Sequence, residues 1–146
     1  MHIESPLGFI ADFPEHTQVL EDSSAGPNTA QYGLLGEVLV TVIKDDTSVQ
    51  GAAQANGWAH LMSEFYLQER KGTLLTEGEL NIPGRSSYAV LVGYADQDGS
   101  AKVAASVGTW QDDRFMGALV IWPYLNPERE PRVDLLKEIV SSIRPA

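Results

Sequence analysis

The chain has 146 residues, 43% of them apolar, and a net charge of −10, which suits one globular domain spanning 1–146. The acidic balance disfavours nucleic acid as a partner, because phosphate backbones repel negative charge. No apolar run approaches the roughly 20 residues that a membrane-spanning helix needs. Without cysteine, the chain has no disulfide, thiolate metal ligand or cysteine nucleophile. The compartment stays open: cytoplasmic, or extracytoplasmic if a leader has been removed.

Acidic residues concentrate in the first third of the chain. Residues 1–50 hold eight acids and one lysine, a net of −7, whereas residues 101–146 hold six acids and six bases. The charge skew alone favours acids that only keep the protein soluble. The functional interpretation is an acidic N-terminal surface that faces a basic protein partner. The candidate partner surface consists of Asp12, Glu15, Glu21 and Asp22.

The first half of the sequence predicts short strands, at about 3–5, 8–13, 17–21, 31–35 and 37–44. Pro14 ends the second strand, and the Gly, Pro, Asn and Ser residues that follow the third favour a loop. β-Branched residues dominate the last of these strands, which favours extended backbone. The polar residues after it are expected to form a loop that caps a helix.

An amphipathic helix is predicted from residue 49 or 52 to residue 70. Gly57, which costs about 1 kcal/mol in mid-helix, is expected to mark close packing. Gly72 favours a stop just beyond the helix. The expected apolar stripe recurs at helical spacing and consists of Trp58, Leu61, Met62, Phe65 and Tyr66.

Four strands and a second helix are predicted to follow. The strands cover about 73–82, 87–95, 101–111 and 115–124. Asp98-Gly99 predicts a two-residue type I′ turn, and Asp112-Asp113 is a second hairpin tip. The helix, about 131–143, has an apolar stripe and is ended by Pro145; the stripe contains Leu135, Leu136, Ile139, Val140 and Ile143.

The last three strands are apolar on both faces. With the predicted turns, hairpin parity places Val90 with Val107 on one face and Leu91 with Ala104 on the other. It also sets Gly108 opposite Gly117, and paired glycines in a sheet indicate something packed close to the backbone. One helix on each face covers both apolar surfaces. We therefore predict an α+β fold, an α/β/α sandwich around a mainly antiparallel sheet.

The order of these elements resembles the PsbP-like superfamily, which includes the photosystem II extrinsic protein, a Ran-binding import factor and bacterial DcrB-type proteins. The resemblance rests on Gly8-Phe9-Ile10-Ala11-Asp12-Phe13-Pro14, the helix before Gly72, Leu80-Asn81-Ile82-Pro83-Gly84-Arg85 before Tyr88, and the closing Ile139-Val140-Ser141-Ser142-Ile143-Arg144. It implies a scaffold that binds other proteins and shares no catalytic site. No catalytic, cofactor-binding or metal residue is carried over from it.

Motifs for catalysis or metal binding are weak in this sequence. His60 and Glu64 share a helix face at i, i+4, but no second histidine ligand accompanies them, which favours a structural or solvated role. Asp96 does not begin an EF-hand, because the sixth position holds Ala101 instead of glycine. The carboxylates of the two hairpin tips, at 96–98 and 112–113, lie about 35 Å apart along one strand and cannot act on one bond. The sequence has no phosphate-binding glycine motif and no nucleophile elbow.

Three functional hypotheses therefore remain. The first is a non-enzymatic interaction module, and the second is a small-molecule carrier or sensor whose pocket between helix and sheet is lined by Trp58, Trp110 and Trp122. The third is an enzyme whose site would unite His60, Glu64, Tyr66 and Arg85. The first is favoured, with no cofactor; a homodimer is left open.

Overall fold

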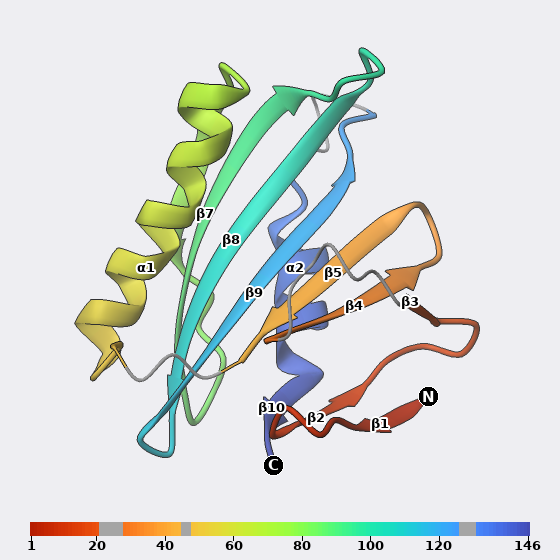
Figure 1. Ribbon diagram of the computed structural model, residues 1–146. Helices are drawn as coiled ribbons and strands as arrows, with labels where there is room; N and C mark the ends of the chain where they lie inside the picture. The colour runs from red at the N-terminus through yellow and green to blue at the C-terminus, as the bar shows by residue number, and fades with distance from the viewer. Residues whose placement is uncertain (21–27, 45–47, 126–130) are drawn as a thin grey trace.

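The computed structural model describes residues 1–20, 28–44, 48–125 and 131–146, and Figure 1 shows their arrangement. Within these residues every strand pair is antiparallel, and the strands form two sheets. In spatial order the larger sheet contains β3 (Gln18–Leu20), β4 (Thr29–Leu34), β5 (Val38–Ile43), β9 (Arg114–Pro123), β8 (Ala101–Gln111), β7 (Ser86–Ala95) and β6 (Thr73–Glu79). The smaller contains β1 (His2–Glu4), β2 (Phe9–Asp12) and β10 (Ile143–Pro145). The helices are α1 (Ala52–Glu64), continued by the π-helical turn η2 (Phe65–Glu69), and α2 (Val133–Ser141).

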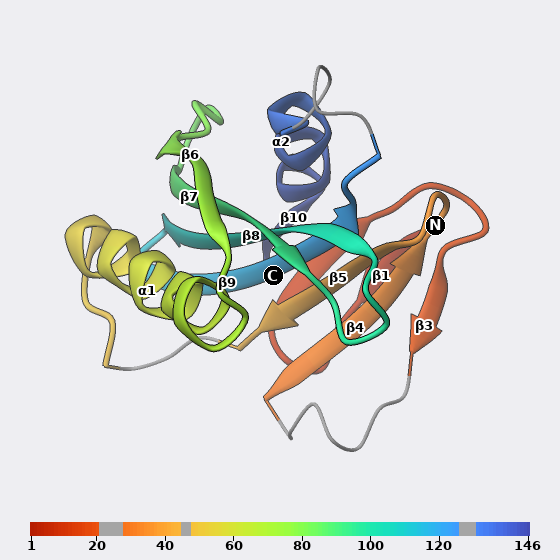
Figure 2. The same ribbon diagram turned by 90° about the horizontal axis from the view of Figure 1, so that it is seen from above.

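The predicted α+β fold, with one helix on each face of the main sheet, is confirmed. Figure 2 shows α1 and α2 on opposite sides of the larger sheet. Ala59 of α1 packs with Val90 and Val92 of β7. The core on the other face combines α2, the smaller sheet and inward side chains of the large sheet. Among the described residues, no helix is both long and apolar enough to cross a membrane.

The β8–β9 hairpin has the predicted register, but the β7–β8 hairpin does not. Gly108 pairs with Gly117 across a two-residue loop. Ala95, however, pairs with Ala101, so the β7–β8 loop has five residues instead of two. The Asp98 carboxylate holds this wider loop by accepting hydrogen bonds from the Ser100 backbone N–H, at 2.9 Å, and from the Ser100 hydroxyl, at 2.5 Å. Val107 therefore pairs with Ala89 instead of Val90. Because side chains alternate along a strand, this one-residue shift in register reverses the predicted faces of β7 relative to β8.

Helix α1 lies so close to the sheet that a Cβ atom on either of two strand glycines would overlap it. A Cβ atom on Gly108 would lie 2.1 Å from the Ala55 carbonyl oxygen. A Cβ on Gly117 would lie 2.5 Å from the Trp58 ring. The prediction that the paired glycines mark close packing by a helix is therefore confirmed.

The same close approach corrects the predicted apolar stripe of α1. The helix buries the small residues Ala55, Ala59 and Ser63, because bulky side chains would hold it away from the sheet. Two members of the predicted stripe instead face solvent: Leu61 is 64% exposed and Phe65 is 48% exposed. The expectation for Gly57 was also wrong, since it is exposed and no neighbouring atom would contact a Cβ there.

The C-terminal helix is shorter than predicted, because the chain turns into strand β10. Helix α2 ends at Ser141, and Ile143 pairs with Ala11 of β2. The Arg85 guanidinium closes the junction by donating hydrogen bonds to the carbonyl oxygens of Val140, at 3.1 Å, and Ile143, at 2.5 Å. Partial burial lowers the pKa of Arg85 from its ordinary value, and two backbone acceptors compensate part of its lost hydration.

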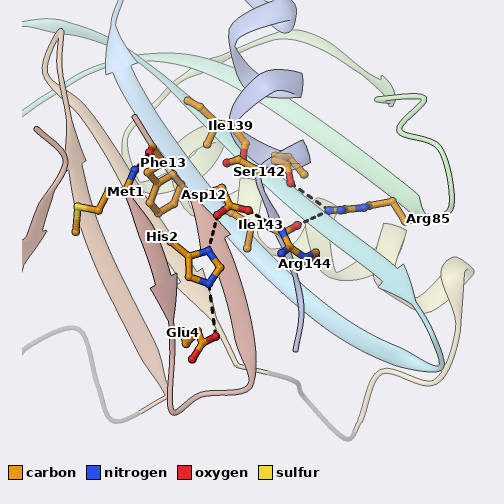
Figure 3. A network of polar contacts seen from close by, with 11 residues as sticks. Met1, His2, Glu4, Asp12, Phe13, Arg85, Ile139, Ser142, Ile143 and Arg144 are labelled. Carbon is orange, nitrogen blue, oxygen red and sulfur yellow. Dashed lines mark hydrogen bonds and ion pairs between the residues drawn. The ribbon is translucent and has the colours of Figure 1, made fainter. Parts of the chain in front are cut away.

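Charged side chains link all three strands of the smaller sheet (Figure 3). The Asp12 carboxylate on β2 lies 2.7 Å from Arg144 Nη1 on β10 and 2.6 Å from His2 Nδ1 on β1. His2 Nε2 also lies 3.5 Å from the Glu4 carboxylate. The hydrogen bond to Asp12 raises the pKa of His2 above its ordinary 6.5, and the hydrogen bond from Arg144 lowers the pKa of Asp12 below 3.8.

Adding one methyl group at Gly108 tests the close approach of α1. We expect Gly108→Ala to lower the free energy of unfolding by about 1–3 kcal/mol, because the helix backbone must move away from the sheet. The matched Gly57→Ala change should raise it by about 1 kcal/mol, since alanine favours helix and meets no neighbour there. Urea denaturation of both variants measures the difference. Equal effects of the two changes would contradict the packing described.

The charged network predicts a defined pH dependence of stability. The raised His2 pKa stabilises the folded state below pH 6.5, and this contribution is lost as pH rises through the folded-state pKa. The Asp12 contribution is present above pH 3.8 and is lost as pH falls through its lowered pKa. NMR titration should show the His2 pKa falling in Asp12→Asn and unchanged in Glu15→Gln. A His2 pKa unaffected by Asp12→Asn would refute the assignment.

Candidate functional site

An apolar hollow lies between α2, the segment after β2 and the β4–β5 hairpin. Its volume is about 420 Å³. Helical spacing places Leu135 and Ile139 on one face of α2, and Leu34, Leu35 and Val38 line the hollow from the hairpin. The remaining lining residues are Asp12, Phe13, Pro14, Glu138 and Ser142. The hollow is thus mostly apolar, with two carboxylates among its lining residues.

A second hollow lies between the same hairpin and β3. Its volume is about 400 Å³. Leu34, Leu35 and Val38 line this hollow as well, so the two hollows meet at the hairpin tip. Its other lining residues are His16, Gln18, Leu20, Gly33, Gly36, Glu37 and Leu39.

The tip of the β4–β5 hairpin exposes a leucine. Leu34 pairs with Val38, which leaves a three-residue loop. Gly36 and Glu37 have φ values of +84° and +61°, so the backbone turns through the left-handed region. Leu35 before them is 73% exposed. The apolar tip is therefore held out from the sheet by a tight turn.

The acidic residues around the hollows differ in how far their charge is compensated. Asp12 lines the first hollow, but its ion pairs with Arg144 and His2 offset its charge and hold its pKa low. In the part of the chain that the structure describes, no cation pairs with Glu37 or Glu138. Within the described residues, these two side chains supply the negative charge of the hollows that no cation offsets.

The structure places two of the four residues of the predicted partner surface. Asp12 lines the first hollow. Glu15 is exposed and lies in the chain between Pro14, which lines the first hollow, and His16, which lines the second. Glu21 and Asp22 fall outside the described residues. Whether this surface binds a partner stays a prediction.

The residues considered for catalysis occupy separate places. His60 Nε2 lies 3.1 Å from Glu77, and the imidazole stacks against Tyr88 with ring centres 5.4 Å apart. Arg85 instead binds backbone oxygens at the end of α2, on the opposite side of the large sheet from α1. Among the described residues, no group of three or more His, Asp or Glu side chains could hold a metal ion.

Of the other two residues considered for catalysis, Glu64 is exposed at the end of α1, and Tyr66 packs against another tyrosine. Its ring centre lies 4.9 Å from that of Tyr94 on β7. Burial raises the pKa of Tyr94 to about 12 and also raises the pKa of Tyr66. Both phenols therefore stay protonated at neutral pH, and the contact between Tyr66 and Tyr94 is aromatic packing.

The three tryptophans do not share one pocket. Trp58 and Trp110 pack against Phe115 beneath α1, with the Trp58 and Phe115 ring centres 5.1 Å apart. Trp122 is buried in the core on the other face of the sheet. The hydrophobic contacts of these side chains are those of core aromatics.

Sequence reasoning missed Leu35, Glu37 and Glu138 as site residues. The Leu-Leu-Gly-Glu stretch at 34–37 joins two predicted strands, and an apolar residue at such a turn is the signal that was available. The sequence around Glu138 gave no indication that this residue lines a hollow. Its position beside the hairpin depends on how α2 packs on the sheet.

Comparison with known proteins identifies the fold. No family model matches the chain, and no curated protein matches it in sequence. The solution structure of cyanobacterial PsbP (CyanoP) from Synechocystis sp. PCC 6803 superposes with a TM-score of 0.67 at 12% identity, over 100% of this chain and 92% of that one.

Two crystal structures are also similar. One, from Bacteroides thetaiotaomicron, has a TM-score of 0.57 at 12% identity, over 99% of this chain and 48% of that one. The other is PA94 from Pseudomonas aeruginosa, a protein of unknown function. It has a TM-score of 0.51 at 13% identity, and the superposition covers 100% of this chain and 96% of PA94.

The resemblance to the PsbP-like superfamily is confirmed at the level of the fold. Similarity at 12–13% identity establishes the arrangement of elements, whereas function depends on the particular side chains that the fold carries. This chain has the PsbP-like fold.

Proposed function

We propose that the protein is a non-enzymatic interaction module that presents its acidic N-terminal surface to another protein. The observation that carries the proposal is the pairing of charge with shape in the first third of the chain. Residues 1–50 carry a net charge of −7 and contribute most of the residues that line two adjoining hollows. Of their acids, Asp12 and Glu37 line the hollows, and Glu15 is exposed between lining residues in the chain. A surface that combines apolar hollows with one sign of charge has the features of a protein-binding site.

The arrangement of reactive side chains supports a role in binding. His60, Tyr66 and Arg85 each have structural contacts on different elements. General acid–base catalysis needs partners within hydrogen-bond reach of one reacting atom. The PsbP-like resemblance likewise implies a scaffold for protein binding. The acidic charge weighs against a nucleic acid partner.

Neutralising the predicted partner surface tests this function. Chemical cross-linking in lysate of the source organism, at low and moderate salt, should capture a protein with the wild-type chain. We expect Glu15→Gln, Glu21→Gln and Asp22→Asn combined to reduce capture about tenfold, and higher salt to reduce it as well, because exposed charges are screened. The control combines Glu64→Gln and Glu69→Gln, which remove charge from the α1 side. Capture that is absent, or equally reduced in both sets, would refute the proposal.

A second candidate function is a carrier or sensor of a small molecule. The first hollow favours it, because about 420 Å³ of mainly apolar space falls within the usual range for ligand pockets. The pocket would lie against α2 and the β4–β5 hairpin, not under the tryptophans.

Thermal shift measurements separate the two candidate functions. A ligand at 100 times its dissociation constant stabilises its binding protein by about 2.7 kcal/mol, which raises Tm by several degrees. We expect a flat response to a panel of metabolites and lipids. A ligand-dependent rise in Tm that Leu135→Ser abolishes would favour the carrier over the interaction module.

A further inference from the structure

We infer that the two hollows beside the β4–β5 hairpin form one docking site. Its occupant is a segment of a partner protein in which large apolar side chains are flanked by lysine or arginine. This inference rests on the proposed function and specifies the chemistry of the partner.

The hollows meet at a single exposed side chain. Leu35 lines both, together with Leu34 and Val38, and stands 73% exposed between them. Leu20, at the outer edge of the second hollow, is also exposed, at 37%. An occupant that covers Leu35 removes apolar surface from water on both sides of the hairpin, and its own apolar side chains have a hollow of about 400 Å³ on each side.

The charge of the site selects a basic occupant. Glu138 lines the first hollow and Glu37 the second, and neither has a cationic partner among the residues that the structure describes. Glu15 is exposed between lining residues of the two hollows. Among the described residues, no lysine or arginine lines either hollow, and His16 is the one basic side chain in their linings. Lysine or arginine on an occupant would therefore meet carboxylates on both sides of the hairpin.

A second copy of this chain is a poor occupant. Each copy carries a net charge of −10, and an interface between equal copies would bring the same carboxylates together. Charge complementarity therefore favours a different, basic protein.

Peptide binding to two leucine variants tests the docking site. The probe is a short fluorescent peptide in which two leucines are flanked by lysines, measured by anisotropy with the full chain at low salt. We expect Leu35→Ser to weaken its binding about tenfold, because an apolar contact is lost. The matched control is Leu61→Ser on α1, which removes a leucine that is 64% exposed, against 73% for Leu35. It should leave binding unchanged. Glu37→Gln with Glu138→Gln should also weaken binding, and Glu64→Gln with Glu69→Gln should not.

Two altered peptides separate the apolar and the charged contribution. Serine in place of the leucines and glutamine in place of the lysines should each weaken binding about tenfold. Equal binding of the serine peptide would overturn the apolar docking site, and equal binding of the glutamine peptide would overturn the basic occupant. Sedimentation equilibrium of the protein alone should give a monomer. A dimer that Leu35→Ser dissociates would assign the site to a second copy and overturn the inference.

The outcomes distinguish this inference from the proposed function. If peptide binding is equal in Leu35→Ser and Leu61→Ser while cross-linking still depends on Glu15, Glu21 and Asp22, the docking site is wrong and the interaction module stands. If the peptide binds as expected but cross-linking captures no protein, the docking site is supported and the proposed interaction module is refuted. Failure of the wild-type chain to bind the peptide at all would overturn the docking site.

Discussion

The structure depends on how closely the backbone of α1 approaches the large sheet. The Ala55 carbonyl oxygen occupies the place that a side chain on Gly108 would take, and Trp58 occupies the corresponding place over Gly117. This contact requires glycine on the strands and small residues on the helix, so Ala55, Ala59 and Ser63 are buried. One face of β7, β8 and β9 is thereby closed by a single helix at short range.

The opposite face of the sheet is closed by several elements that must be held together. Helix α2 supplies Leu136, Ile139 and Val140 to that core, and the smaller sheet packs beside it. Arg85 fixes the end of α2, and Asp12 joins β1 to β10 through His2 and Arg144. The first hollow lies where this composite layer meets the β4–β5 hairpin. The candidate site is thus a product of the layered fold, because its walls come from elements distant in sequence.

The sequence predicted the layers of the fold better than it predicted individual faces and sites. Paired glycines and a strand that is apolar on both sides were sufficient to place a helix on each face. Leaving either apolar face of the sheet exposed to water would cost too much free energy. The α1 stripe was misassigned, because hydrophobic periodicity ranks Leu61 above Ala59 although close packing selects the smaller residue. The β7 faces were reversed, because the Asp98 side chain stabilises a five-residue loop where Asp-Gly favours two. Glu138 gave no signal, since its role arises only when α2 meets the hairpin.

Exposed apolar side chains alone do not mark a binding surface, and the exposed leucines of this protein have different surroundings. Leu61 and Phe65 are exposed on the outer side of α1, where Arg70 lies over the Phe65 ring at 5.5 Å. That contact covers part of the ring with a cation of the same chain. Leu35 instead stands between two hollows that contain carboxylates without cationic partners among the described residues. An occupant there can bury apolar surface and neutralise charge at once, whereas beside Phe65 a cation of the same chain is already in place. This difference is the physical ground on which the hairpin tip, and not α1, is proposed to bind a basic partner.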